Sequence, residues 1–245
     1  MRKYIILGVL LAVLLGLTIW MTSLGSVGIF KMFPPMKVLS ATLRHLQIVG
    51  AAELLAIAIG IPIGFLSTRR AMRFVSPVLI GGANVGQTIP TLAFIGIAGA
   101  VLGMGYKAAV IALFVYGMLP IIRNTYAGVR SVDPAVKEAA RGMGMPKWRV
   151  TSKVELRLAM PVILAGIRTS TVVNVGTAAV AGMIGAGGLG ELIVTGLAVR
   201  VIQLILQGAA PTAALAVILD AIIGGFESWI TPRGLKVLKT AQWQQ

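Results

Sequence analysis

Three glycines are the first candidates for binding a cofactor. Gly185, Gly187 and Gly190 have the GxGxxG spacing that lets a backbone approach the pyrophosphate of a dinucleotide. That spacing binds a dinucleotide only between a strand and a helix of a βαβ unit. A long apolar segment precedes these glycines instead. The sequence therefore argues against a dinucleotide site and favours a turn at this point.

Residues that carry catalysis or bind metals are scarce. The chain has no Cys, a single histidine, His45, and seven acidic residues. It also has no GxxxxGK[ST] loop, so it does not build a nucleotide-hydrolysing site in the usual way. Because His45 has no paired carboxylates near it in sequence, we expect an interfacial, structural histidine rather than a metal or Ser/His/Asp site. We predict no enzymatic active site, no metal site and no cofactor in this chain.

Four ionisable residues interrupt apolar runs, namely Glu53, Arg168, Asp220 and Glu227. At mid-membrane each would cost about 2.5–3.5 kcal/mol on insertion scales, so these side chains are expected to face protein or water. Arg168 and Asp220 are expected to neutralise one another or to line a cytoplasmic mouth. For Glu53 two interpretations stay open: a carboxylate that attracts an organic cation into a pathway, or a helix-packing group at headgroup level.

Amides and hydroxyls form a second polar set. Asn84, Gln87 and Thr88 interrupt one apolar run, and Asn174 interrupts another. Such residues occur where a helix lines a water-filled path or kinks. They also occur where helices hydrogen-bond to one another, and both interpretations stay open. The candidate residues of a translocation path are Glu53, Asn84, Gln87, Thr88, Arg168 and Asn174.

Composition predicts the kind of element that positions these residues. Of the 245 residues, 57% are hydrophobic and only 12% are charged, and the mean hydropathy is +0.92. Soluble domains of this size are less apolar, so we predict an all-α integral membrane protein. The formal net charge of +15 does not indicate a nucleic-acid partner, because the basic residues lie between apolar runs. That distribution is typical of the positive-inside rule.

Six apolar segments are predicted to span the membrane, which takes about 20 residues per helix. They are residues 4–21, 46–66, 74–104, 108–122, 161–184 and 201–225. The first is predicted to be a retained span rather than a cleaved signal peptide. Residues 23–45 are predicted to be a connector in which Pro34 and Pro35 lead into a short interfacial helix. With alternate loops on the same side, sixteen Lys and Arg fall on the side of both termini and five on the other, which predicts cytoplasmic termini.

The longest polar segment, residues 123–157, carries eight Lys and Arg and is predicted to be cytoplasmic. Asp133 is expected to cap a first short helix in which Pro134 takes the first position, and two glycines end it. Pro146 is expected to begin a second helix, whose basic side chains stay solvated or near lipid phosphates. Periodicity alone leaves an ordinary solvated linker as an equal alternative.

The residues of this loop resemble a known family. Glu138, Ala139 and Ala140, followed by Gly144, resemble the EAA loop of ABC importer permeases. In that family the loop forms a coupling helix that docks into a groove on the ATPase subunit. The resemblance therefore implies that these four residues couple the chain to an ATPase. Arg157 stands where the family commonly carries Pro, so the second loop helix is expected to run further.

The resemblance extends beyond the loop, over about residues 46–235. Three segments are similar to permeases of the glycine betaine, choline and carnitine importers: NVGQTIPTLAFIGIAG from Asn84, ALFVYGMLPIIRNTYAGV from Ala112, and AGIRTSTVVNVGTAAVAGMIGAGGLGELI from Ala165. It implies the type I ABC importer permease architecture, with six transmembrane helices and both ends cytoplasmic. Residues 1–245 would form a single transmembrane permease domain with its coupling loop at about 123–160.

The implied function is ATP-driven import of a small osmoprotectant or quaternary amine by alternating access, across the cytoplasmic (inner) membrane of a prokaryote. The implied partners are two ATP-binding subunits that carry ATP and Mg, a second permease copy or homologue, an external solute-binding protein and membrane lipid. One alternative is a permease for methionine or another amino acid, since methionine importers share a related GAGGLG stretch. Another is an ion-coupled secondary transporter, which should show internal repeats with broken helices at matching positions. No such repeats are visible in the sequence.

Overall fold

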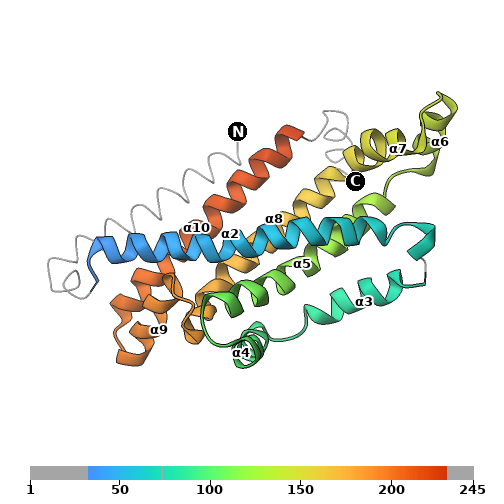
Figure 1. The fold of residues 1–245 in the computed structure, drawn as a ribbon. Helices are drawn as coiled ribbons and strands as arrows, with labels where there is room; N and C mark the ends of the chain where they lie inside the picture. The colour runs from blue at the N-terminus through green and yellow to red at the C-terminus, as the bar shows by residue number, and fades with distance from the viewer. Residues whose placement is uncertain (1–32, 73, 231–245) are drawn as a thin grey trace, which may run out of the picture. The chain divides into compact units, whose positions relative to one another are not determined.

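The computed structural model describes residues 33–72 and 74–230, which are built from helices (Figure 1). There is no strand among them, so the all-α prediction is confirmed for this part of the chain. The helices, labelled as in Figure 1, are α2 (Pro35–Leu66), η3 (Arg70–Met72), α3 (Ser76–Gly86), α4 (Thr91–Leu102), α5 (Tyr106–Arg130), α6 (Pro134–Gly142), α7 (Lys147–Val150), η4 (Thr151–Glu155), α8 (Leu156–Val180), η5 (Ala181–Ile184), α9 (Leu189–Val199) and α10 (Ile202–Ile230).

Four helical stretches in residues 33–72 and 74–230 are long and apolar enough to cross a membrane. They are α2, α5, the stretch Lys147–Ile184, and α10. The bent pair α3 and α4 adds a fifth if both helices belong to one span. The first predicted span, residues 4–21, lies outside the described residues. The prediction of a membrane protein with several helical spans agrees with these lengths.

In two places a helix that was predicted to precede a span is continuous with that span, for the same physical reason. α2 begins at Pro35 and not at residue 46, so the predicted connector and short interfacial helix are part of one long helix. Likewise, helix runs without a gap from Lys147 through η4 into α8, and Pro161 lies inside α8 rather than at its start. Neither residues 36–45 nor residues 147–160 contain a Gly or Pro. A helix that begins after a proline therefore has nothing to stop it there.

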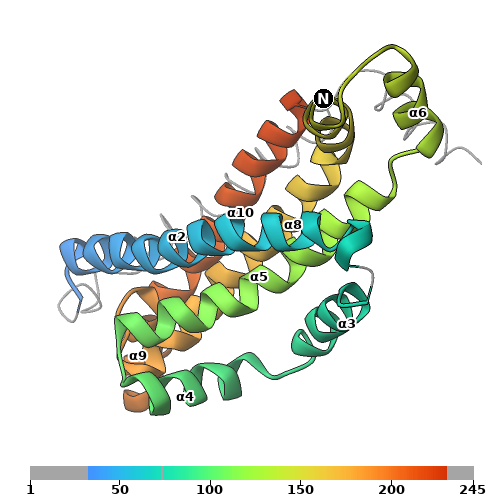
Figure 2. The ribbon, with the colours of Figure 1, turned by 45° about the vertical axis from the view of Figure 1, so that its right-hand side comes forward.

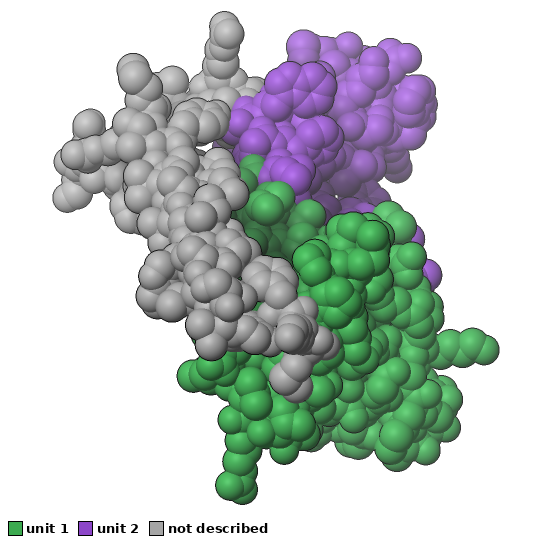
Figure 3. Space-filling model, turned by 90° about the vertical axis from the view of Figure 1, so that its left-hand side faces the viewer, with its two compact units in different colours: residues 1–54, 89–117, 171–221 green, residues 55–88, 118–170, 222–245 purple. Residues whose placement is uncertain are grey.

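The chain forms two compact units, each assembled from segments that are distant in sequence (Figure 3). Among the described residues, unit 1 contains 33–54, 89–117 and 171–221, and unit 2 contains 55–72, 74–88, 118–170 and 222–230. The helices α2, α5, α8 and α10 each contribute residues to both units.

The core of unit 1 joins its parts of α2, α4, α5 and α8. Its largest fully buried side chains include Ile48, Leu113 and Val175. Most of the other buried members are alanines, which let neighbouring helices approach closely, as is typical of helix packing in membranes.

The glycine-rich turn after η5 also belongs to unit 1. Gly185, Gly187 and Gly188 have φ values of 72°, 82° and 77°, a region that side chains with a Cβ rarely adopt. Gly190, in the first turn of α9, packs directly against the backbone of Ala179. A 3-10 helix precedes the turn, so these residues are not in the strand–turn–helix context that a dinucleotide site requires.

In unit 2 a GxxxG pair brings α2 against α5. A Cβ on Gly64 would lie 2.6 Å from the carbonyl oxygen of Ile122 and 2.8 Å from Cβ of Thr125, which is too close. A Cβ on Gly60 would lie 3.1 Å from the Ile121 side chain. Small residues four apart lie on one face of a helix and permit this backbone approach.

Candidate functional site

Local signals in the sequence specify the first helix of the polar loop. The Asp133 side chain accepts a hydrogen bond of 2.8 Å from the backbone N–H of Ala135, and Pro134 takes the first position of α6. The helix ends at Gly142, and Gly144 has a φ of 80°. α7 then begins after Pro146. The predicted helix starts at Pro134 and after Pro146 are confirmed, and in both views α6 lies past the end of α5 (Figure 1, Figure 2).

The outer surface of this loop combines one acid with apolar side chains. Glu138 and Ala139 are exposed on α6, whereas Ala140 is buried. Val136 and Met143 are also exposed, by 43% and 72%, although both are apolar. Residues 136, 139 and 143 lie on one side of α6, because positions three and four apart share a helix face. An exposed apolar strip of this kind is typical of a surface that binds a partner.

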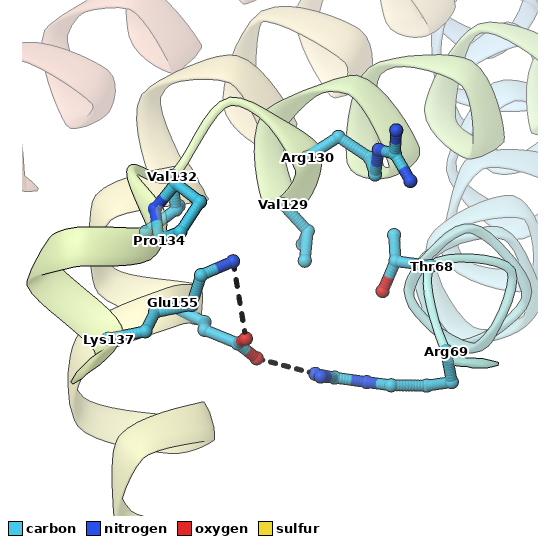
Figure 4. A pocket seen from close by; sticks show the side chains of 8 residues that line it. All are labelled: Thr68, Arg69, Val129, Arg130, Val132, Pro134, Lys137 and Glu155. Carbon is cyan, nitrogen blue, oxygen red and sulfur yellow. Dashed lines mark hydrogen bonds and ion pairs between the residues drawn. The ribbon is translucent and has the colours of Figure 1, made fainter. Parts of the chain in front are cut away.

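Beneath the loop, one carboxylate joins three segments of unit 2 (Figure 4). Glu155 is only 5% exposed, and its Oε2 accepts a 2.6 Å hydrogen bond from Nη2 of Arg69, which follows α2. Its Oε1 lies 3.8 Å from Nζ of Lys137 on α6. The hydroxyl of Thr151 donates to Oε2 over 3.3 Å. The π-helical turn Thr151–Glu155 thus presents a buried acid to the end of α2 and to α6.

Sequence reasoning did not identify Glu155 as a site residue. The nearest charged residues in sequence are Lys153 and Arg157, but residues two apart point in different directions on a helix. The actual partner, Arg69, is 86 positions away. The one available signal was an acid within a strongly basic segment, which says that a partner exists but not which one.

Two of the six candidate path residues are in contact in unit 1. Nδ2 of Asn174 on α8 donates a 2.9 Å hydrogen bond to Oε2 of Glu53 on α2, and both side chains are buried. At the next residue of α8, the carbonyl oxygen of Val175 accepts a 3.0 Å hydrogen bond from Nε2 of His45. His45 is fully buried, and a structural role agrees with this bond. These contacts tie α2 to α8.

The other four candidates belong to unit 2. Asn84 is exposed on α3, Gln87 follows the last residue of α3, and Thr88 lies exposed in the break before α4. The Thr88 hydroxyl donates to the carbonyl oxygen of Val85 over 2.7 Å. Arg168 is half-buried on α8, and its guanidinium lies beside Gly224. Three of these four residues therefore follow one another where the third predicted span is broken.

Within the residues that the structure describes, no group of three or more His, Cys, Asp or Glu side chains is arranged to hold a metal ion. The buried carboxylates Glu53 and Glu155 instead bond to an amide and to basic side chains.

A family model and the similar proteins both point to permeases of transport systems. Residues 60–233 match the family model described as "Binding-protein-dependent transport system inner membrane component". The chain is 40% identical over 203 residues to the glycine betaine/carnitine/choline transport system permease protein OpuCB of Bacillus subtilis, covering 83% of this chain and 93% of that protein. It is 42% identical over 189 residues to the osmoprotectant import permease protein OsmY of Salmonella typhimurium, covering 77% of this chain and 80% of the other.

Solved structures support the fold. An inward-facing form of the MetNI methionine ABC transporter superposes with a TM-score of 0.68 at 22% identity, covering 81% of this chain and 99% of the matched chain. A crystal structure of an amino acid ABC transporter with histidines gives a TM-score of 0.67 at 20% identity, covering 82% and 98%.

Proposed function

This chain belongs to the family of binding-protein-dependent transport system inner membrane components, and we propose that it is the permease for a small osmoprotectant such as glycine betaine, choline or carnitine. Members of this family are non-catalytic, multi-pass subunits of ABC importers, so ATP is hydrolysed by a separate subunit. The substrate proposal is supported by relatives of 40–42% identity whose names include these solutes or the word osmoprotectant. The likeness to amino acid transporters concerns the fold alone.

The observation that carries the proposed coupling mechanism is the exposed strip on α6. Glu138, Ala139, Ala140 and Gly144 form the segment that contacts an ATPase subunit. Ala139 lets a partner surface approach closely, and the exposed Glu138 offers a charge that can be paired there. Ala140 is buried, so it packs α6 against the rest of the chain. The left-handed conformation of Gly144 directs the chain back toward α7.

Glu155 carries motion from this segment into the membrane helices. When two ATPase subunits close on ATP, they draw the α6 segments of two permeases together. Lys137 on α6 and Arg69 just after α2 both pair with the Glu155 carboxylate, so a displacement of α6 is transmitted to the end of α2. Alternating access follows from such displacements, and release after hydrolysis returns the chain to its first state.

The full transporter contains two permeases, two ATPase subunits that bind ATP and Mg, and an external solute-binding protein. Each permease has six spans with both termini in the cytoplasm, which places α6 on the ATPase side. The translocation path follows polar groups within the apolar helices: Glu53, Asn84, Gln87, Thr88, Arg168 and Asn174. Asn84 and Thr88 support this assignment because both are exposed beside the break between α3 and α4.

Uptake of radiolabelled solute by the reconstituted complex tests the proposal. Proteoliposomes should accumulate glycine betaine, choline or carnitine only with internal ATP. Glu138→Arg should abolish this uptake by reversing the charge at the contact, and Gly144→Asp should abolish it because a side chain strains that conformation. Ser152→Arg, on an exposed position outside α6, is the matched control and should retain uptake.

The contrary outcomes are distinct. Wild-type uptake by both α6 variants would refute the coupling assignment but not the substrate class. Accumulation of methionine and none of the three osmolytes would refute the substrate class. Uptake that follows an ion gradient without ATP would refute the importer itself.

A further inference from the structure

A cavity of about 350 Å³ opens beside the Glu155 contact in unit 2 (Figure 4). Its polar walls come from Thr68 and Arg69 after α2, Arg130 at the end of α5, Lys137 on α6, and Glu155. At roughly 30 Å³ per water molecule, the space holds the equivalent of about ten waters. It is therefore large enough for a small anion together with water.

The walls carry more positive than negative charge. Three cationic side chains and one carboxylate line it, so two positive charges are not compensated by the cavity's own acid. Lys137 lies 3.8 Å from Glu155, beyond hydrogen-bond length, which leaves its ammonium donors available. Arg69 uses Nη2 for Glu155, but a guanidinium has more N–H groups than one carboxylate oxygen accepts.

Arg130 is the least engaged of the three cations. Within the described part of the chain, Cζ of Arg130 lies 5.9 Å from the centroid of the Tyr126 ring, and the Arg130 side chain is exposed. At that distance a cation–π contact is weak. The cavity therefore presents surplus N–H donors from two arginines and a lysine around a space lined by a single acidic group.

The cavity lies where long apolar helices give way to charged sequence. α2 ends at Leu66 and α5 ends at Arg130, and both helices are candidate spans. Lipid phosphate groups occupy this level of a bilayer, and basic pockets there bind anionic headgroups. The apolar side chains of Val129 and Val132 complete the wall and suit the glycerol or acyl part of a lipid.

We propose that this cavity binds a phosphate group, carried either by an anionic lipid headgroup or by free inorganic phosphate. The bound phosphate bridges Arg130 of α5, Lys137 of α6 and Arg69 of the segment after α2. Glu155 orients the last two cations and offsets their mutual repulsion. The phosphate then acts as a second link between α6 and the ends of two membrane helices.

Native mass spectrometry of the purified full chain tests the lipid source. Dioleoyl phosphatidylglycerol and dioleoyl phosphatidylcholine are added separately to the protein in detergent. The wild type should retain phosphatidylglycerol in preference, and Arg130→Gln should retain it about tenfold less, the loss expected for one charge-assisted hydrogen bond. The control is Arg123→Gln, which removes an exposed arginine about two turns earlier on α5 and should bind like the wild type.

Calorimetric titration with inorganic phosphate tests the other source. Phosphate binding that weakens about tenfold in Arg130→Gln, and that phosphatidylglycerol displaces, identifies free phosphate as a ligand of the same site. Arg130 is exposed, so the variant should keep the elution volume and melting temperature of the wild type. Lys137→Gln provides a second substitution in the same wall and should weaken binding similarly.

Two results would overturn the proposal. One is equal retention of both lipids by the wild type together with no binding of phosphate. The other is an equal loss in Arg130→Gln and Arg123→Gln, which would mean that only total charge matters.

Discussion

Replacing Glu155 by glutamine should loosen the attachment of α6 without changing the shape of the side chain. The substitution removes the negative charge that faces Arg69 at 2.6 Å and Lys137 at 3.8 Å, but keeps an oxygen that can accept a hydrogen bond. We expect lower thermal stability of the chain and slower uptake by the complex, because α6 and the end of α2 then move less as one body.

The size of the effect follows from the two contacts. The short bond to Arg69 is charge-assisted and reaches a buried carboxylate, so it contributes about 1.5–3 kcal/mol. The longer pair with Lys137 is partly exposed and contributes less than about 1 kcal/mol. A net loss of about 2 kcal/mol lowers the melting temperature of a chain of this size by roughly 4–8 °C.

A double-mutant cycle separates the contacts from other effects of each substitution. Thermal unfolding of the purified chain in mild detergent is followed by tryptophan fluorescence for Glu155→Gln, Arg69→Gln and the double variant. Their coupling energy should be about 1.5–3 kcal/mol. The same cycle with Arg157→Gln is the control. Arg157 is exposed and two positions from Glu155, so that cycle should give no coupling.

The reasoning fails if Arg69 and Glu155 prove additive to within about 0.5 kcal/mol. It also fails if Arg157 couples to Glu155 as strongly as Arg69 does, since a general charge effect would then explain the loss.

Three further predictions concern packing, topology and the path. Gly64→Ala should lower the melting temperature, because its Cβ would lie 2.6 Å from the Ile122 oxygen. Gly50→Ala on the same helix meets open space and should not lower it. Equal shifts of the melting temperature would contradict the α2–α5 contact. Since the chain has no cysteine, a single introduced cysteine reports on which side of the membrane its position lies. Ser152→Cys should react with an impermeant maleimide only after lysis, whereas Met104→Cys should already react in intact cells. The reverse pattern would contradict cytoplasmic termini. Thr88→Cys should react with a small polar thiol reagent if that position faces water, and no reaction in any transport state would exclude it from the path.

Local chemistry made part of this structure predictable. The Asp133 cap, Pro134 at the first helical position and the glycines after α6 act on their own neighbours within a few residues, so sequence reasoning located the loop helices. Pro34 and Pro35 do lead into a helix, as expected, but that helix continues through the second predicted span instead of being a short one. Pro161 was expected to begin a span, whereas the helical turns around it continue through it.

Pairing between distant residues was not predictable from one sequence. Glu53 and Asn174 were both candidate path residues because polar groups within apolar helices are expected to face protein or water. They are 121 positions apart, and nothing in the spacing says that they bond to each other. Glu155 and Arg69 show the same limit, since a helix pattern gives the direction of a side chain but not the identity of the opposing helix.

The π-helical turn of η4 has a consequence for how this chain tolerates change. Such a turn is equivalent to one extra residue inserted into an α-helix. Deleting a single residue from 151–154 would restore regular winding and rotate the preceding loop by about 100° around the axis of α8. Gly166 would stay against α5, but Lys137 would no longer oppose Glu155. The insertion thus sets the angular phase of the loop independently of the phase of the membrane helix.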